Sequence, residues 1–260
     1  MADTSTILFE RIGSVALIRL NRPHVLNAFD GVMRCALRDT LADVGADDAV
    51  RAVIMTGEGR LFSAGADLKS TQPTAQQTRA QLLEEYGPAL QSITAIPKPV
   101  IAAINGPAVG VGLAYALICD LRVMAQSAYL QAPFNAIGLL PDGGLSWLLP
   151  HALGYARAFA FVTGARRLDA AECLSLGLIN RIVPDGQAVT AALRWANDLA
   201  AGPAAAIAAT KRAMRAGCNA DYGQALATEA DLQAPLVASA DFAEGVAAFR
   251  AGRDPKFKGP

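Results

Sequence analysis

Apolar residues in the first half of the chain fall into short runs that predict strands, separated by stretches of helical periodicity. Residues 7–13 and 14–23 have the pattern of two hairpin arms joined at a Gly-Ser pair. Residues 29–47 carry apolar side chains at helical spacing, with Asp30 placed as the N-cap. The predicted buried face of this helix consists of Val32, Met33, Ala36, Leu37 and Leu41.

The alternation continues to about residue 131 and predicts one α/β core. Short buried strands are predicted at residues 51–57, 99–106, 121–125 and 128–132. Helices are predicted at residues 74–96, where Gly87–Pro88 is a candidate interruption, and at residues 109–120. Strands that alternate with helices in this way are typical of a mostly parallel sheet covered by helices.

The second half of the chain has a different pattern, in which residues 180–184 form the one clear strand signal. From Gln187 onward, helical segments are separated by Gly and Pro. We therefore predict a core of residues 1–195 followed by a helical region of residues 196–260. An alanine-rich helical tail packs either against other subunits or as a layer on its own core, and the pattern alone favours neither.

Composition excludes several classes of function. With 53% hydrophobic residues, the chain has enough apolar surface for a large core or for contacts between subunits. The 23 basic residues balance the 23 acidic ones, so we expect neither nucleic acid nor a membrane as a partner. The four cysteines form no C-x-x-C pair and the two histidines stand alone, which predicts no metal site.

The ends and apolar stretches of the sequence favour a cytoplasmic location. Residues 1–10 have neither a basic start nor a long apolar run, so we expect no signal peptide. Residues 99–120 are the most apolar stretch, but Pro107 and several glycines interrupt them. This pattern predicts a strand, a turn and a helix rather than a membrane span.

Two loops of small residues could hold an anion. The first, residues 59–70, contains Ala64, Gly65 and Ala66; the second, residues 104–116, leads into a helix that begins near Gly110. The first N–H groups of a helix lack intrahelical partners, and two such amides aimed at one carbonyl oxygen form an oxyanion hole. Tight packing is the alternative explanation for small residues in either loop. A dinucleotide site fits poorly, because the glycine pattern is incomplete.

Five segments together resemble the crotonase family, the enoyl-CoA hydratase/isomerase superfamily. They span residues 20–29, 62–69, 98–125, 137–144 and 241–260. The resemblance implies a spiral of repeated ββα turns, with a C-terminal helical trimerisation region and assembly as a homotrimer or a dimer of trimers. It also implies an acyl-CoA thioester as substrate, with no separate cofactor, because coenzyme A is part of that substrate.

The resemblance assigns residues to the substrate. The backbone amides of Ala66 and Val111 correspond to the pair that stabilises the thioester enolate, and Gly110 precedes the second of them. The segment near the first loop that binds coenzyme A corresponds to His24, Val25, Leu26, Ala64, Asp67, Leu68 and Lys69. Asp67 has a second interpretation, in which it braces the loop by hydrogen bonding.

The sequence departs from the hydratases of this family at both of their catalytic glutamates, where it has Ala114 and Phe134. General acid–base groups each contribute roughly 100- to 10,000-fold to a rate, and neither side chain can act as one. With Trp147 they either shape an apolar acyl pocket or fill the core.

Asp142, in the segment 137–144, is the remaining candidate acid. One carboxylate is sufficient for a 1,3-proton shift, and the segment resembles that of isomerases with a single acid in this turn. Pro-Asp-Gly is also a strong turn sequence, so a structural role is the alternative. We therefore predict an acyl-CoA isomerase. A hydratase or lyase that uses another residue, a nucleophilic role for Asp142, and a non-catalytic acyl-CoA-binding protein remain open.

Overall fold

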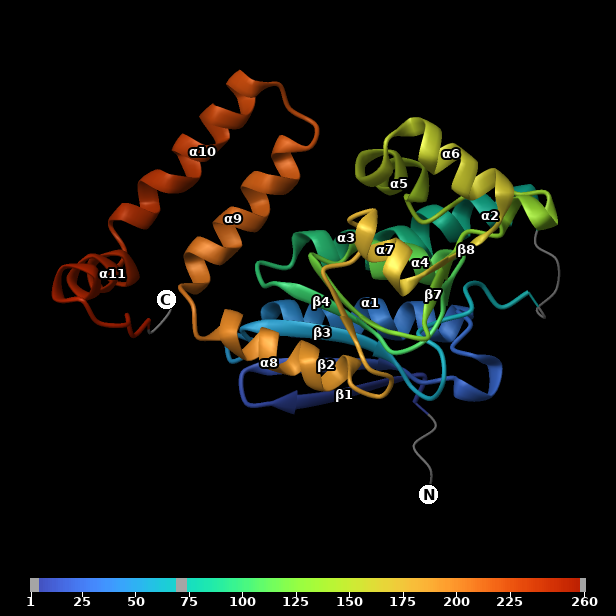
Figure 1. Ribbon diagram of the computed structural model, residues 1–260, viewed down its shortest axis with the longest axis horizontal. Helices are drawn as coiled ribbons and strands as arrows, with labels where there is room; N and C mark the ends of the chain where they lie inside the picture. Colours follow the sequence, from blue (N-terminus) through green and yellow to red (C-terminus); the bar gives the residue numbers. More distant parts are fainter. Residues whose placement is uncertain (1–4, 69–73, 258–260) are drawn as a thin grey trace.

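The computed structural model describes residues 5–68 and 74–257. Its main sheet has the order β1-β2-β3-β4-β6-β9, in which β1 is antiparallel to β2 and the other neighbours are parallel (Figure 1). These strands are Ile7–Ile12, Val15–Leu20, Ala52–Gly57, Val100–Ile104, Leu121–Ala125 and Arg181–Val183. A smaller sheet has the order β5-β7-β8, formed by Ala108–Val109, Tyr129–Gln131 and Arg167–Asp169.

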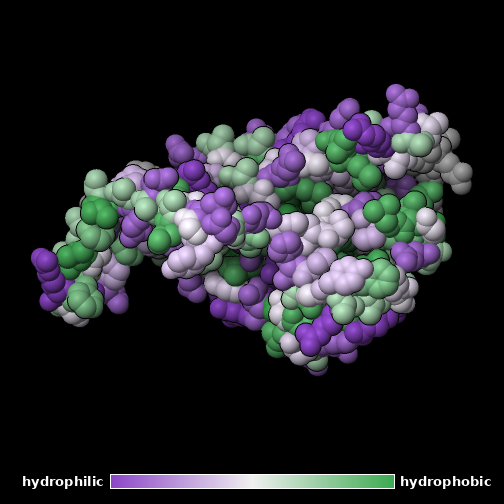
Figure 2. Space-filling model, turned by 90° about the horizontal axis from the view of Figure 1, so that it is seen from above, coloured by the Kyte–Doolittle hydropathy of each residue, from purple (hydrophilic) through white to green (hydrophobic). Residues whose placement is uncertain are grey.

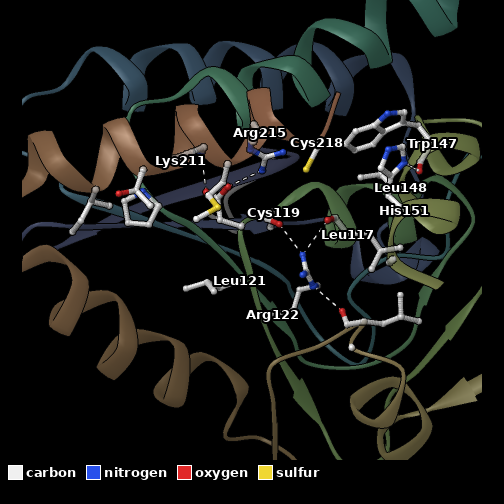
Figure 3. Close-up of a pocket in the computed structure, with 18 of the residues that line it drawn as sticks. Leu117, Cys119, Leu121, Arg122, Trp147, Leu148, His151, Lys211, Arg215 and Cys218 are labelled. Atoms are coloured by element: carbon white, nitrogen blue, oxygen red, sulfur yellow. Dashed lines mark hydrogen bonds and ion pairs between the residues drawn. The ribbon is translucent and has the colours of Figure 1, made fainter. Parts of the chain in front are cut away.

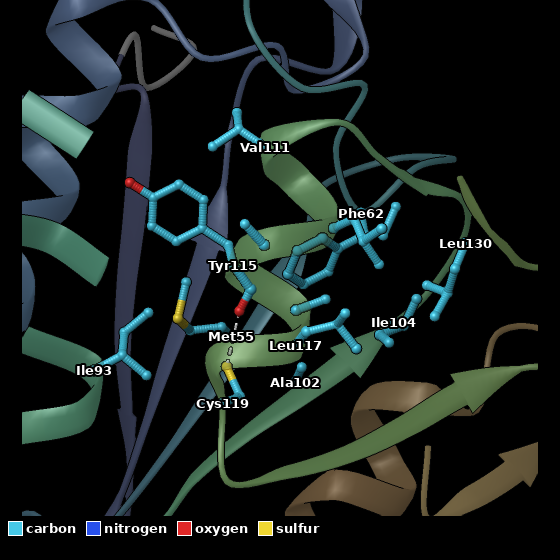
Figure 4. Packing of buried hydrophobic residues seen from close by; sticks show 14 of the residues in the cluster. Met55, Phe62, Ile93, Ala102, Ile104, Val111, Tyr115, Leu117, Cys119 and Leu130 are labelled. Carbon is cyan, nitrogen blue, oxygen red and sulfur yellow. Dashed lines mark hydrogen bonds between the residues drawn. The ribbon is translucent and has the colours of Figure 1, made fainter. Parts of the chain in front are cut away.

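Helices cover both faces of the main sheet, so its central strands are apolar on both sides. One face packs against α1 (Gly31–Ala46), α3 (Gly87–Ala95) and α4 (Val111–Ile118), and the other against α8 (Ala188–Ala200). Alternate residues of β3 belong to the two resulting clusters: Met55 to the first and Ile54 to the second. Figure 4 shows the first cluster, in which α4 lies across the sheet.

Shorter elements surround this core. The single-turn segments are η1 (Pro23–Val25), the π-helix η2 (Gln81–Tyr86) and η3 (Phe134–Ile137). The remaining helices are α2 (Ala75–Ala80), α5 (Leu145–Leu153), α6 (Tyr155–Gly164), α7 (Ala170–Ser175), α9 (Ala204–Gly217), α10 (Tyr222–Val237) and α11 (Ala240–Ala251).

The last three helices form an arm beside the layered core (Figure 1). α10 runs back along α9, whereas α8 still packs on β3 and β4, so the predicted boundary after residue 195 falls inside α8. Apolar side chains reach the surface of the arm, as Figure 2 shows at the left. The large ones include Met214, Leu226, Val237, Phe242 and Phe249. Within the described residues, no helix is long and apolar enough to cross a membrane.

Most of the predicted elements are confirmed. The hairpin forms with β1 and β2, and the Asp30 side chain caps α1 by accepting a hydrogen bond from the Met33 amide at 2.8 Å. Other details were wrong: Val32 is 66% exposed, and the short strands β5 and β8 were not predicted. The helix over residues 74–96 does not break at Gly87–Pro88, because the chain continues through a π-turn in which the Gly87 amide donates to Leu82.

Candidate active site

The first small-residue loop is held by Asn27, a buried residue in the left-handed conformation with φ of 55°. Its Nδ2 donates to the carbonyl oxygens of Glu58 and Leu61, both at 2.9 Å, and its Oδ1 accepts from the Arg22 amide at 2.9 Å. The Ser63 hydroxyl donates to the Asn27 carbonyl oxygen at 2.8 Å. The Asn27 side chain therefore ties the start of the first loop to the residue that follows β3.

Gly65 brings the two loops into contact. Its φ is +97°, and a Cβ atom there would lie 2.9 Å from the Val109 carbonyl oxygen and 3.5 Å from the Val111 nitrogen. Any larger residue would push the loops apart, so glycine is needed for close approach as well as for its φ angle. The second loop is thus placed directly beside the first.

The amides of Ala66 and Val111 are both unpaired within the described part of the chain. Phe29 donates to the Gly65 carbonyl oxygen at 2.8 Å and accepts from the Asp67 amide at 3.0 Å, so the Ala66 N–H points away from this bridge. Val111 is the first residue of α4, whose N-cap Gly110 has φ of 57°. Its N–H therefore has no partner within the helix. Two unpaired amides from adjoining loops form an arrangement suited to an oxyanion.

Asp67 braces the first loop. Arg22 donates from Nη1 to Asp67 Oδ2 at 3.0 Å, and its Nη2 lies 3.0 Å from Asp30 Oδ2. The arginine thus ties the loop to the N-terminus of α1, which is the second of the two interpretations made from the sequence. Arg22 itself was missed, although it lies within the segment 20–29 that carries the family resemblance.

Two cavities flank Ala66. One of about 530 Å³ is lined by His24, Val25 and Leu26 together with Ala66, Asp67 and Leu68. Ala64 is tied to this wall, because its amide donates to the Leu26 carbonyl oxygen at 2.9 Å. Most of the residues predicted to hold coenzyme A therefore lie together, and Lys69 lies outside the described residues.

The second cavity, of about 900 Å³, also has Ala66 in its lining. Its lining includes Phe29, Arg34, Glu85, Tyr86 and Ile137. Side chains from residues 77–86, in the segment between the two loops, therefore contribute to it. Arg34 and Glu85 were not singled out from the sequence, because a charged pair on two helices resembles any solvated ion pair.

Asp142 lies on a turn that packs against the start of α4. A Cβ atom at Gly143, which has φ of +61°, would lie 2.6 Å from the Ala114 Cβ and 3.1 Å from the Val111 Cγ2. The turn that carries Asp142 therefore packs against the side chains of Val111 and Ala114 at the start of α4. The turn leads into α5, but the N-cap of α5 is Gly144 and no side chain caps that helix.

Asp142 is half-buried, and one of its two carboxylate oxygens is buried without a partner among the described residues. Its Oδ1 has no hydrogen-bond partner within the described residues. Burial raises the pKa of Asp142 from 3.8 to about 6, and a hydrogen bond from its own backbone opposes this rise. A carboxylate with one buried, unpartnered oxygen and a pKa of about 6 is a candidate proton-transfer group.

Two tyrosines lie near this carboxylate. Tyr115 of α4 is fully buried, stacks on Phe29 with 4.6 Å between ring centroids, and has no hydrogen-bond partner for its hydroxyl within the described residues. Figure 4 shows its ring beside Val111. Burial raises the pKa of both Tyr115 and Tyr86, to about 12 for Tyr86, and the nearby charge of Asp142 adds to each rise.

The three residues proposed for an apolar acyl pocket are not brought together. Ala114 and Phe134 are buried in the core cluster. Trp147 lies in a separate groove of about 630 Å³ between the core and α9, with its Nε1 3.1 Å from Asn219 Oδ1 and its ring beside His151 (Figure 3). Among the described residues, the lining of the 900 Å³ cavity beside Ala66 includes none of the three.

Comparisons with known proteins agree with this arrangement. The family described as enoyl-CoA hydratase/isomerase matches residues 10–260. A protein described as a probable enoyl-CoA hydratase from Rhodobacter capsulatus is 43% identical over 257 residues, which cover 98% of both chains. A 1,2-epoxyphenylacetyl-CoA isomerase from Escherichia coli is 36% identical over 249 residues, covering 94% of this chain and 95% of that protein.

A solved structure agrees as well. The crystal structure of an enoyl-CoA hydratase from Bacillus anthracis superposes with a TM-score of 0.93 at 30% identity. The match covers 98% of this chain and 100% of that one. The similarity therefore extends over both the layered core and the helical arm.

Proposed function

Because the chain belongs to the enoyl-CoA hydratase/isomerase family, we propose that it is an acyl-CoA isomerase in which Asp142 transfers the proton. The thioester carbonyl oxygen accepts hydrogen bonds from the Ala66 and Val111 amides. Removal of a proton from the carbon next to the carbonyl places negative charge on that oxygen. Each amide then stabilises the enolate by roughly 3 kcal/mol.

The observation that carries the proposal is the buried Oδ1 of Asp142, which has no hydrogen-bond partner within the described residues, on a turn that packs against Val111. A proton shift within one substrate needs a group that takes a proton and returns it. A pKa of about 6 suits both steps, because the group is neither too weak a base nor too weak an acid near neutral pH. The same group serves two carbons, so a second acid is not required.

A hydratase is the second candidate. The Asp142 Oδ1 and the Tyr115 hydroxyl are both buried without partners within the described residues, and one water molecule between them would satisfy an acceptor and a donor. The Rhodobacter relative is itself described as a probable hydratase. In this alternative, the water is the reactant.

Two assays on one set of variants separate the candidates. We expect the wild type to isomerise a 3-enoyl-CoA, and Asp142→Asn to lower the rate by roughly 100- to 10,000-fold. Asp39→Asn, which changes an exposed acid on α1, is the matched control and should keep full activity. Crotonyl-CoA hydration that survives in Asp142→Asn would contradict the isomerase assignment. A covalent adduct at Asp142, detected by mass spectrometry, would indicate a nucleophile instead.

We also propose that the chain acts in the cytoplasm as a homotrimer or a dimer of trimers, with no cofactor besides the coenzyme A of its substrate. The exposed apolar side chains on α9, α10 and α11 support assembly, because such residues are normally covered. Sedimentation equilibrium measures the mass of the assembly directly. A monomer at micromolar concentration would contradict this part of the proposal.

A further inference from the structure

The larger of the two cavities beside Ala66, of about 900 Å³, has a polar wall. Besides Phe29 and Tyr86, it is lined by Arg34 of α1, by Glu85 of η2, and by Gln77 and Gln81. An alkyl chain gains free energy when it buries apolar surface, but against a charged pair it also removes water from the charges. A cavity built only for a long alkyl chain would not need this wall.

Arg34 is buried, and almost all of its donors are already used. Its Nε and Nη2 lie 2.7 Å and 2.6 Å from Glu85 Oε2, and its Nη1 donates to the Phe29 carbonyl oxygen and the Tyr86 hydroxyl, both at 3.3 Å. The guanidinium also lies 4.7 Å from the centroid of the Tyr86 ring. Arg34 is therefore a fixed support rather than a ligand for an anionic substrate.

Glu85 keeps one acceptor for the cavity. Both contacts with Arg34 use Oε2, and Oε1 accepts no hydrogen bond within the described part of the chain. The Glu85 side chain is 36% exposed. The Tyr86 hydroxyl accepts from Arg34, so its own proton is available to an acceptor. Glu85 and Tyr86 both line the cavity, so it offers a carboxylate oxygen and a hydroxyl proton to a group that both donates and accepts, as an alcohol does.

Charges around the cavity disfavour an acyl group that ends in a carboxylate. Asp30, Asp67 and Glu85 all line it, and Arg34 is already paired. Arg22 offsets both aspartates through its own ion pairs. A neutral hydroxyl avoids the repulsion and still reaches the free carboxylate oxygen.

We propose that the preferred acyl group carries a hydroxyl that donates to Glu85, which makes Glu85 the residue that determines acyl specificity, with Arg34 as its positioning partner. The inference rests on the proposed function in taking this cavity for the acyl group of the thioester. It adds that the substrate is an oxygenated acyl-CoA rather than a plain fatty acyl-CoA.

The test is a binding measurement on saturated acyl-CoAs, which cannot isomerise. Straight-chain acyl-CoAs of increasing length are compared with their terminally hydroxylated counterparts by isothermal titration calorimetry. A hydrogen bond to a charged group predicts that the wild type binds the hydroxylated ligand roughly 10- to 100-fold more tightly at one chain length. Glu84→Leu, which changes the exposed neighbour on the same helix, is the control and should keep this preference.

Glu85→Leu alone would leave Arg34 buried without its partner, so the decisive variant is the double replacement Arg34→Met/Glu85→Leu, which removes both charges. We expect it to bind the alkyl ligand at least as tightly as the hydroxylated one. A wild type without preference at every length, or a preference that survives the double replacement, would overturn the proposal. Because these ligands do not react, the result is independent of whether Asp142→Asn abolishes isomerisation.

Discussion

Replacing Asp142 with Asn should make the protein more stable above about pH 6, although it removes the proposed catalytic acid. Burial raises the pKa of this carboxyl from 3.8 to about 6 in the folded state. The folded protein therefore keeps the proton over a pH range in which the unfolded chain has released it. Because the folded state binds more protons there, stability falls as pH rises from about 4 to about 6 and then stays level.

The rise in the pKa sets the magnitude. Each tenfold change in the acid dissociation constant corresponds to about 1.4 kcal/mol, so ionising Asp142 costs the folded state about 3 kcal/mol. Asparagine has the same shape and no charge at any pH. The difference in free energy of unfolding between variant and wild type should be near zero at pH 4 and should approach about 3 kcal/mol above pH 6.

The assay is guanidinium-induced unfolding of both proteins at a series of pH values. Protomer concentration is held constant, since assembly would otherwise shift the midpoint. Two stability curves that stay parallel from pH 4 to pH 8 would refute the reasoning, because they would mean that Asp142 is solvated. A wild type that gains stability over the variant as pH rises would mean that its carboxylate has a partner in the folded state.

Three further replacements test the surroundings of the carboxylate. Gly143→Ala should destabilise the fold by more than about 2 kcal/mol and lower activity, because the new Cβ would lie 2.6 Å from Ala114. Gly144→Ala should cost only about 1 kcal/mol, because that glycine has φ of +81° but no atom within 4 Å of the Cβ position. Tyr115→Phe should raise the free energy of unfolding by about 1 kcal/mol, since it removes a buried hydroxyl without a partner in the described residues. The measurement is urea-induced unfolding. A lower free energy of unfolding for Tyr115→Phe than for the wild type would contradict this expectation and would indicate a buried water bonded to the hydroxyl.

The elements that the sequence predicted well depend on local interactions. The Asp30 cap of α1 and the β1–β2 hairpin each involve residues close together in the chain. The α/β spiral expected from the family resemblance is confirmed by the structural match over nearly the whole chain. Short-range patterns and long motifs were therefore sufficient for the architecture.

What the sequence missed depends on contacts between distant segments. Trp147 is near Asp142 in the chain, yet it faces α9 and bonds to Asn219. The Arg34–Glu85 pair joins α1 to η2, and no periodicity shows that a π-turn places Glu85 on the wall of a cavity. β8 is a strand of three residues with one buried side chain, which is too short to produce an alternating pattern.

Ala114, where the family resemblance leads one to expect a glutamate, packs against the turn that carries Asp142. In the sequence these are two separate observations, a small residue on α4 and a carboxylate in a Pro-Asp-Gly turn. In the structure, Ala114 faces Gly143 so closely that a methyl group at 143 would collide with it. A longer side chain at 114 would displace the turn from the start of α4. The small pair Ala114–Gly143 therefore allows the turn that carries Asp142 to pack against Val111 at the start of α4. The small residue at 114 and the position of this turn belong to one packing arrangement.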